Sequence, residues 1–266
     1  MSARRRDAGP GTVLPSPLWL VDRILYRDGL ILIIDKPAGV PVHAGSGGGI
    51  NLEHYFEALR FGLPQPPALA HRLDRDTSGC LVLGRHRKAL ARVGRLFQNG
   101  QVEKVYWTVV RGRPPAAAGT VDLPLRKRSE VRGWWMEPHP EGQASRTDYR
   151  VLGEGEGITW LECRPRTGRT HQIRVHCAEL GCPVLGDPVY GRAGGAVPAE
   201  PLHLHARSIA LPLYPNRAAV TAVAAPTDHM VAALTRCGYD GAGEPSAAPG
   251  HVSEDAIQAG REACST

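Results

Sequence analysis

The sequence lacks the features that would mark a protein for a membrane, for export or for disulfide bonding. No apolar run reaches the roughly 18 residues that a membrane-spanning helix needs. The first 17 residues, MSARRRDAGPGTVLPSP, lack the apolar core of a signal peptide. The six cysteines form no CxxC pair and no regular disulfide framework. These absences favour a soluble cytoplasmic protein with reduced thiols.

The composition fits one main domain with an anionic partner. The chain has 266 residues, 42% of them hydrophobic, which is enough for one substantial core. Its 32 Lys and Arg exceed its 26 Asp and Glu, and the formal charge of +6 favours nucleic acid as a partner. We expect a folded domain over residues 18 to 228, with disordered tails over 1 to 17 and 238 to 266, because the tails have too little apolar surface to repay ordering.

Apolar periodicity predicts more strands than helices. A buried strand is expected at Leu30 to Ile34, and further strands within 103–112, 145–153, 157–165, 201–213 and 216–226. Helices are expected within 50–60, 86–100 and 170–181, with Thr170 as the N-cap of the last one and Gly100 and Gly181 as stop signals. Because strands and helices do not alternate strictly, an α+β fold with a mixed sheet is favoured over a doubly wound parallel one.

The stretch AHRLDRDTSGC, residues 70 to 80, combines acids and arginines directly before an apolar run. Asp74 lies between Arg72 and Arg75, and a carboxylate beside guanidinium groups stays ionised. Such a carboxylate is either a positioned nucleophile or a structural anion. The turn signal at residues 77 to 79 favours the first role, because a loop packed on a buried strand is a rigid platform for a functional side chain. Asp76 is expected to help shape this loop.

An alternative reading of the same stretch is an aspartyl phosphatase. Residues 74 to 78 approach the DxDx[TV] pattern, in which the first Asp attacks phosphorus beside a bound Mg²⁺. However, His71 and Arg72 stand where that pattern has an apolar strand, and no clear pair of later acids completes a Mg²⁺ site. A magnesium-dependent phosphatase therefore stays open as an alternative.

A second basic cluster, RPRTGRTHQIRVH, spans residues 164 to 176. His171 and Arg174 are three residues apart, so they are expected to share one face of the first turn of a helix, where the helix dipole also favours an anion. A solvated basic helix start is the alternative. Ile173 and Cys177 argue against it, because they supply an apolar face that would hold Arg174 at a packed boundary.

Three further features carry weaker signals. His203 and His205 alternate along a predicted strand without a third ligand at useful spacing, so they are interpreted as structural histidines. The AGSGGG run at 44–49 has neither the Lys-Ser/Thr ending of a phosphate loop nor the GxGxxG order of a dinucleotide site, and is expected to be a flexible loop. Trp134 and Trp135, close to the basic run at 126–128, can stack on bases or serve in packing.

Five blocks in one order give the chain a family resemblance. They are DKPAGVPVH (35–43), HRLDRDTSG (71–79), EKVYWTVV (103–110), TGRTHQIRVH (167–176) and LGDPVYG (185–191). With these blocks the chain resembles the RluA-type family of RNA pseudouridine synthases over about residues 20 to 228. The resemblance implies a large, mostly antiparallel mixed sheet with flanking helices and a central basic catalytic cleft. The chain resembles the compact subgroup that has no accessory RNA-binding domain at its N-terminus.

The resemblance implies an isomerase that converts uridine in RNA to pseudouridine without a cofactor or metal. Asp74 matches the catalytic aspartate of the family, Arg174 the arginine paired with it, and Tyr106 the active-site tyrosine. Arg72 resembles the arginine that helps to flip the base out of the RNA stack. Whether Asp74 adds to the sugar, removes a ribose proton or attacks the base stays open.

The expected partner is tRNA or rRNA, bound by a monomer. Besides Arg72, the residues expected to contact RNA are Arg75, Thr77, Lys104, Arg169, His171 and Gln172. Residues 111 to 147, which hold the basic run and both tryptophans, are where substrate choice is expected to reside. A non-catalytic RNA-binding module would explain the charge, but not why Asp74 lies among arginines, and it stays as the other alternative.

Overall fold

A computed structural model describes residues 17–44, 49–130, 133–191 and 200–241. The expected N-terminal tail up to residue 16, the centre of the expected glycine-rich loop and all but the first residues of the expected C-terminal tail lie outside these ranges. So does the side chain of Trp134. No helix of the described residues is long and apolar enough to cross a membrane.

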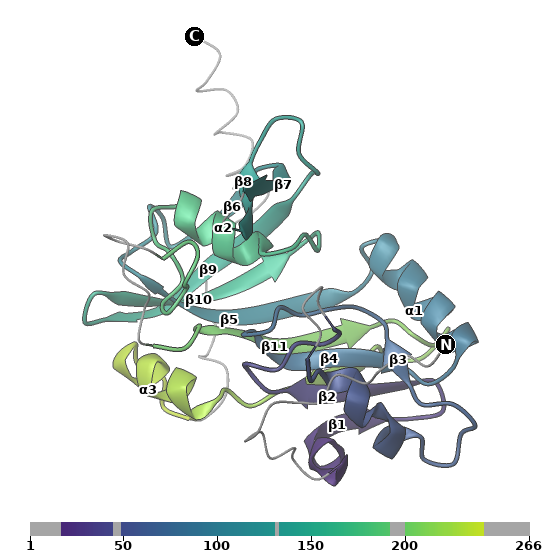
Figure 1. The fold of residues 1–266 in the computed structure, drawn as a ribbon. Coiled ribbons are helices and arrows are strands. Elements are labelled where there is room, and N and C mark those ends of the chain that lie inside the picture. Colours follow the sequence, from purple (N-terminus) through teal and green to yellow (C-terminus); the bar gives the residue numbers. More distant parts are fainter. Residues whose placement is uncertain (1–16, 45–48, 131–132, 192–199, 242–266) are drawn as a thin grey trace.

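One large sheet runs through the whole structure, in the strand order β1-β2-β4-β11-β5-β10-β9-β6. Strand β3 pairs with β4 and β12 with β11, which makes ten strands, and only the β4–β11 contact is parallel. Figure 1 shows β1 and β2 at one end and β6 at the other. The mostly antiparallel α+β fold predicted from the sequence is confirmed. The strands are β1 (Ile24–Arg27), β2 (Ile31–Lys36), β3 (Ala68–Leu69), β4 (Ser78–Gly84), β5 (Glu103–Arg111), β6 (Ala118–Asp122), β9 (Arg146–Gly155), β10 (Ile158–Pro165), β11 (Leu204–Leu211) and β12 (Val220–Val223).

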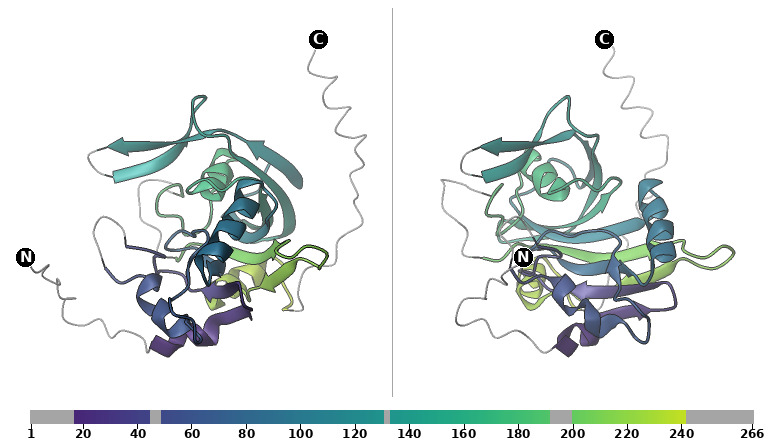
Figure 2. Two further views of the ribbon diagram at one scale, coloured as in Figure 1. Left: turned by 90° about the vertical axis from the view of Figure 1, so that its right-hand side faces the viewer. Right: turned by 45° about the vertical axis from the view of Figure 1, so that its right-hand side comes forward.

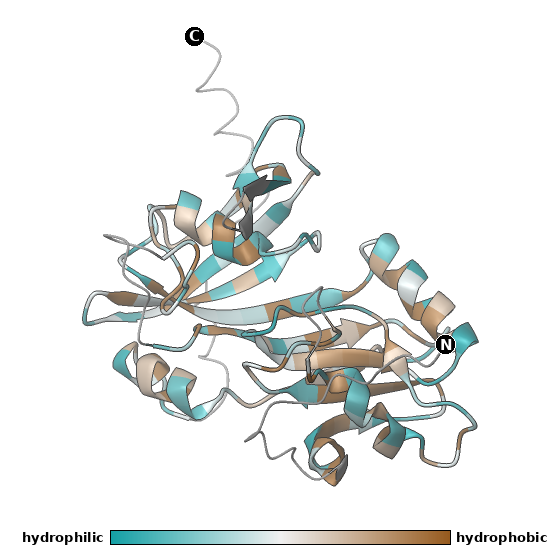
Figure 3. Cartoon of the chain, viewed as in Figure 1, coloured by the Kyte–Doolittle hydropathy of each residue, from teal (hydrophilic) through white to brown (hydrophobic). Residues whose placement is uncertain are grey.

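The first half of the sheet is covered by short helices. Strands β2 and β4 are buried almost throughout, which explains their continuous apolar sequences. The 3₁₀ helices η1 (Pro17–Arg23) and η2 (Leu52–Leu59) and the helix α1 (Arg87–Gln98) flank this half. Figure 3 shows the apolar residues concentrated on β2 and β4 and the polar residues on the outer turns of α1. The helix expected within 50–60 is therefore present, but as a 3₁₀ helix.

The second half of the sheet has a helix on each face. On β5, Val105, Trp107 and Val109 pack with α3 (Asp228–Arg236), whereas Val110 packs on the other face with residues of α2 (Gln172–Glu179). Helix α3 starts at the expected domain boundary, residue 228, and was not among the predicted helices, although Met230, Ala233 and Leu234 stand at helical spacing. Its Met230 and Leu234 are fully buried, so the packed structure continues past that boundary.

A two-stranded hairpin stands apart from the large sheet. It consists of β7 (Leu125–Glu130) and β8 (Gly133–Pro138), and it lies beside α2 (Figures 1 and 2). Leu125 and Met136 of the hairpin pack against Val175 of α2, with Tyr190 at the edge of the same cluster. This hairpin lies within the segment from which substrate choice was expected.

The parallel contact between β4 and β11 depends on a glycine. Gly79 has φ +101, and a Cβ at this position would lie 2.3 Å from the Ala206 carbonyl oxygen. A side chain would therefore be strained by the backbone and would collide with the neighbouring strand. The close approach fixes the start of β4, and with it the loop that carries Asp74.

We predict that Gly79→Ala lowers the free energy of unfolding by about 3 kcal/mol, because the clash is with backbone that cannot rotate away. Urea denaturation measures this loss. The matched control is Gly94→Ala in the interior of α1, where a Cβ would meet nothing within 4 Å. This control is expected to stabilise the protein by about 0.5–1 kcal/mol. Equal stability of the two variants would contradict the strained role of Gly79.

Candidate active site

The loop before β4 lines a cavity and is anchored by two of its own side chains. Leu73 is buried, and His71 Nε2 accepts a hydrogen bond from the Val82 N–H at 3.0 Å. Burial lowers the pKa of His71 to about 4, so it is a neutral anchor. Arg72, which lies between these two anchors, is exposed, and the side chain of Asp74 is 21% exposed to solvent. Arg72 and Asp74 both line the cavity described below.

A buried lysine holds the turn that follows Asp74. The Thr77 N–H donates to the Asp74 carbonyl at 3.2 Å, which closes the turn. Lys36 Nζ, fully buried, donates to the carbonyls of Pro37, Arg75 and Thr77 at 2.7, 2.8 and 2.8 Å. Burial lowers the pKa of Lys36 to about 7, although the nearby Asp76 and Asp74 charges oppose this. The sequence blocks included Lys36, but its role in this turn was missed.

A cavity of about 570 Å³ lies over β5, between the C-terminal end of α1 and the loop that precedes α2. Eight of the ten residues predicted for the site line it. They are Arg72, Asp74, Thr77, Lys104, Tyr106, Arg169, His171 and Gln172. Residues from three distant parts of the sequence therefore meet in one place, as the five blocks predicted.

Two side chains of the second basic cluster converge on Asp74. Arg174 Nη1 lies 3.6 Å and His171 Nε2 3.9 Å from the same oxygen, Oδ2. The structure brings Arg174 beside Asp74, as the sequence suggested, but His171 reaches Asp74 from just outside the helix and not from the face of its first turn. Both distances exceed that of a hydrogen bond. The carboxylate is thus held electrostatically from one side, while the cavity side is left accessible.

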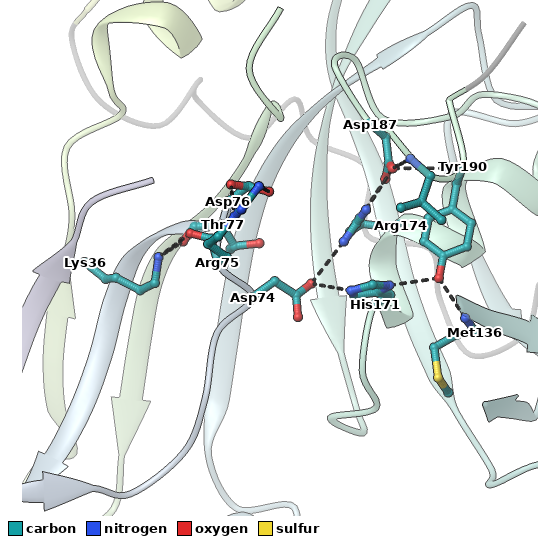
Figure 4. Close-up of polar contacts among 11 residues, drawn as sticks. Lys36, Asp74, Arg75, Asp76, Thr77, Met136, His171, Arg174, Asp187 and Tyr190 are labelled. Atoms are coloured by element: carbon teal, nitrogen blue, oxygen red, sulfur yellow. Dashed lines mark hydrogen bonds and ion pairs between the residues drawn. The ribbon is translucent and has the colours of Figure 1, made fainter. Parts of the chain in front are cut away.

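A second acid, Asp187, holds Arg174. Arg174 Nε and Nη2 donate to the two carboxylate oxygens of Asp187 at 2.7 and 2.8 Å, and Asp187 is fully buried. Burial acts to raise the pKa of Asp187, but the hydrogen bonds and charge of Arg174 outweigh it, and the pKa is lowered. Figure 4 shows the guanidinium between the two carboxylates. Asp187 was in the LGDPVYG block, but sequence spacing could not pair it with Arg174.

The start of α2 differs from the prediction. The helix begins at Gln172 and its N-cap is His171, with φ +53 and no side-chain cap, so the prediction of Thr170 as N-cap was wrong. Instead, Gln172 Oε1 accepts hydrogen bonds from Thr167 Oγ1 and the Arg169 N–H. These bonds fold the preceding loop, and the left-handed backbone of His171 then turns its ring toward Asp74.

Tyr106 and Lys104 are neighbours on the cavity side of β5. Burial, followed by the negative charge of Asp74, raises the pKa of Tyr106 far above its usual range, so the phenol stays protonated. Lys104 Nζ donates to the Thr167 carbonyl at 3.0 Å, and burial lowers its pKa to about 8. Tyr106 thus adds a neutral aromatic ring beside Asp74, and Lys104 adds a cation at the cavity wall.

Three of the residues expected to contact RNA have other surroundings. Arg75 is exposed, pairs with Asp76 at 3.0 Å and does not line the main cavity. Gln172 is buried, and its amide nitrogen donates to Arg146 and Thr147 while its oxygen accepts the two bonds described above. Thr77 is buried as well. Gln172 and Thr77 therefore shape the loops that line the cavity.

Basic residues are exposed on α1 and on the hairpin β7–β8. Helix α1, whose end lines the cavity, carries Arg87, Lys88, Arg92 and Arg95 and no acid. Arg87 and Lys88 in its first turn oppose the helix dipole, which is a cost that an anionic partner would offset. On the hairpin, Arg126 and Arg128 pair with Glu137 at 2.8 and 3.2 Å. Across the described ranges, no three His, Cys, Asp or Glu side chains are grouped so that they could hold a metal ion.

The chain is similar to proteins of one family in sequence. A model of the RNA pseudouridylate synthase family matches residues 30–179. An uncharacterized RNA pseudouridine synthase of Zymomonas mobilis is 43% identical over 194 residues, which cover 72% of this chain and 89% of that protein. The ribosomal large subunit pseudouridine synthase C of Vibrio cholerae is 38% identical over 239 residues, which cover 86% of this chain and 73% of that protein.

Solved structures agree with the sequence comparisons. The human RNA pseudouridylate synthase domain containing 4 superposes with a TM-score of 0.70 at 29% identity, covering 83% of this chain and 94% of that one. The human RNA pseudouridylate synthase domain containing 1 superposes with a TM-score of 0.63 at 25% identity. This match covers 88% of this chain and 100% of that one.

We predict that Asp187→Asn lowers the free energy of unfolding by about 3 kcal/mol at neutral pH, because it leaves the buried Arg174 charge without its main partner. The pKa of Asp187 is lowered in the folded state, so its contribution is present above the usual aspartate pKa and is lost as the pH falls through the lowered value. The difference in the free energy of unfolding between this variant and the wild type should therefore be smaller at about pH 3 than at neutral pH. Urea denaturation at both pH values measures it.

The control for this prediction is Glu156→Gln, which removes an exposed acid paired with Arg236. An exposed pair contributes about 0–1 kcal/mol, so this variant should resemble the wild type at both pH values. A loss from Asp187→Asn as small as that of the control would contradict the role assigned to the buried pair.

Proposed function

Because the chain belongs to the RluA-type family of RNA pseudouridine synthases, we propose that it isomerises uridines of ribosomal RNA to pseudouridine with Asp74 as the acting carboxylate. The observation that carries this proposal is the setting of Asp74. Its carboxylate lies at a cavity of suitable size for a nucleoside, held by Arg174 and His171 from one side only.

The reaction requires a carboxylate in this position. The glycosidic bond from the ribose to the uracil nitrogen breaks, the uracil turns, and a bond from the ribose to ring carbon five forms. That carbon loses its proton and the freed ring nitrogen gains one, so the product is an isomer of uridine. During the exchange the ribose carbon is electron-poor. Asp74 either captures that carbon or removes a ribose proton, and both routes need an ionised carboxylate beside the sugar. The Arg174 guanidinium lies 3.6 Å from this carboxylate.

Tyr106 is proposed to hold the uracil and to help in the final proton loss. Its ring lines the cavity beside Asp74 and can stack on the base. Its raised pKa makes the free hydroxyl a poor base. In the route in which Asp74 bonds to the sugar, the carboxylate leaves when ring carbon five bonds to the ribose, so Asp74 is charged again when that carbon loses its proton. Tyr106 is therefore proposed to position the base for this loss rather than to take the proton itself.

Arg72 is proposed to support the RNA when the uridine leaves its stack. It is exposed at the rim of the cavity, next to Asp74 in the same loop. Extruding a base costs a few kcal/mol, and a planar guanidinium can fill the gap and bind phosphate. Lys104 and Arg169 at the cavity wall are proposed to bind the RNA backbone.

The wider RNA surface is proposed to include α1 and the hairpin β7–β8. Arg87, Lys88 and Arg95 are exposed on α1, whose end borders the cavity. On the hairpin, the Arg128 guanidinium lies 5.5 Å from the centre of the Trp135 ring. This basic and aromatic stretch lies in the segment 111–147, to which we assign substrate choice. Gln172 and Thr77 are not included, because both side chains are buried and the Gln172 amide is bonded within the loops.

The ribosomal RNA of the large subunit is proposed as the substrate. Several relatives, at 35–38% identity, carry the name ribosomal large subunit pseudouridine synthase C. The net charge of +6 fits either rRNA or tRNA as the partner. The proposed chemistry uses side chains of a single chain and needs no cofactor, and it takes place in the cytoplasm.

We predict that Asp74→Asn abolishes pseudouridine formation while RNA binding stays within about threefold of the wild type, since an amide can neither capture the sugar nor take its proton. Large-subunit rRNA and tRNA from cells that lack the protein, labelled with tritium at uracil carbon five, are the substrates. Release of tritium measures the reaction, and filter binding measures affinity.

The matched control is Asp76→Asn, which changes an acid two residues away that pairs with Arg75 on the outside of the loop. It should retain most of the activity. Full activity of Asp74→Asn would refute the mechanism, and release from tRNA alone would refute rRNA as the substrate.

We further predict that changing Arg87, Lys88 and Arg95 together to Gln weakens RNA binding and makes it less dependent on salt. Each lost phosphate contact lowers the slope of log K against log salt by about 0.7–0.9. The control is the triple change of Arg60, Arg150 and Arg236 to Gln, none of which lines the cavity and each of which pairs with a glutamate. Equal salt slopes for the two triple variants would rule out an RNA contact by α1.

A further inference from the structure

A second chain of contacts reaches Asp74 through His171. His171 Nδ1 lies 2.9 Å from Tyr190 Oη, and the Met136 N–H of β8 donates to the same hydroxyl at 2.9 Å. Figure 4 shows these groups in a row, with His171 between Asp74 and Tyr190. The row joins the hairpin β7–β8 to the proposed catalytic carboxylate.

We propose that Tyr190 is a positioning residue that holds His171 in the tautomer whose Nε2–H points at Asp74, and that couples this setting to the hairpin through Met136. The inference rests on the proposed function only in that it takes Asp74 as the acting carboxylate. Tyr190 itself does not touch the reacting atoms.

The hydrogen-bonding capacity of the Tyr190 hydroxyl supports this tautomer. A phenol has one hydrogen to donate, and its lone pairs accept. The Met136 N–H can only donate, so it uses a lone pair of Tyr190 Oη. The remaining hydrogen can then go to His171 Nδ1, which leaves the ring proton on Nε2, 3.9 Å from Asp74 Oδ2. In the other tautomer the Nε2 lone pair would face a carboxylate oxygen, which is repulsive.

The protonation states around His171 agree with a neutral ring. Its charged and titratable surroundings are Asp74 and Arg72 from the loop before β4, Arg174 on α2, and Asp187 and Tyr190 from the loop after α2. Burial lowers the pKa of His171, and the attraction of Asp74 does not compensate fully. Burial raises the pKa of Tyr190 to about 12, so its hydroxyl keeps its proton.

The backbone fixes both partners in place. His171 has a left-handed conformation, φ +53, which an L-residue keeps only where its surroundings hold it. Asp187 Oδ1 accepts hydrogen bonds from the Val189 and Tyr190 N–H groups at 2.8 and 3.0 Å. The Arg174 guanidinium lies 5.2 Å from the centre of the Tyr190 ring. Asp187 therefore positions Arg174 and Tyr190 together, and both of these act on Asp74.

The hairpin depends on the same tyrosine. It forms its own two-stranded sheet, and the Met136 N–H bond to Tyr190 and a small apolar cluster hold it beside α2. A shift of the hairpin on binding RNA would move the group that sets the His171 tautomer. The coupling would thus adjust Asp74 when RNA occupies the hairpin.

The test is Tyr190→Phe, which removes the hydroxyl and keeps the ring. We expect kcat to fall by about tenfold with KM within about twofold, as for loss of a positioning hydrogen bond. Nitrogen-15 NMR of labelled histidines is expected to show His171 protonated at Nε2 in the wild type, whereas in Tyr190→Phe the tautomers mix and the pKa of His171 rises. The matched control is Tyr214→Phe, which removes a hydroxyl bonded to Asp28 away from the cavity, and which should leave kcat and the His171 signals unchanged.

A double variant distinguishes a positioning role of Tyr190 from a general structural effect of losing its hydroxyl. In a His171→Gln background, Tyr190→Phe should lower kcat no further, because the residue it positions is gone. An equal loss with and without His171 would overturn the proposal. So would protonation of wild-type His171 at Nδ1, or an unchanged tautomer in Tyr190→Phe. These NMR results do not depend on turnover, so they are distinguishable from a failure of Asp74→Asn to abolish the reaction.

Discussion

The buried guanidinium of Arg174 is the interaction on which the rest of the site depends. A charge removed from water is stable in a protein only when it is paired and hydrogen-bonded. Asp187 meets this need with two short hydrogen bonds, which leaves the third nitrogen of Arg174 to face Asp74 at 3.6 Å. Because Asp187 already satisfies the arginine, Asp74 is attracted without being consumed in a hydrogen bond. That distinction separates a reactive carboxylate from a structural one.

The opposite side of Asp74 is held by the backbone. Lys36 binds three carbonyls around the turn, and Gly79 lets β4 approach β11 closely enough to place it. The backbone of the loop is therefore held by the first half of the sheet. The groups that face the Asp74 carboxylate, Arg174 and His171, come from the second half. The cavity lies where these two halves meet, so the reacting carboxylate needs both to be folded correctly.

The loop after α2 combines two functions in a few residues. Asp187 orients Arg174, and Tyr190 contacts both His171 and the hairpin. Asp187 and Tyr190 each reach Asp74 through one intervening residue, Arg174 or His171. This gives the surface that we assign to RNA a physical link to the carboxylate, through groups that stay out of the reaction. A change in this loop is therefore expected to affect turnover more than binding.

The sequence by itself determined the family, the α+β fold and the set of residues around Asp74, because these are written in contiguous blocks and in the local periodicity of strands and helices. It also indicated Arg174 as the partner of Asp74 from the family pattern. It did not reveal Lys36 as the support of the turn, Asp187 as the main partner of Arg174, or the internal bonding of Gln172, and Thr170 was wrongly taken as a helix cap. These features depend on which polar groups meet after folding and how many partners each one has already found. Only the tertiary structure decided that, because a buried side chain is satisfied by residues far away in the sequence.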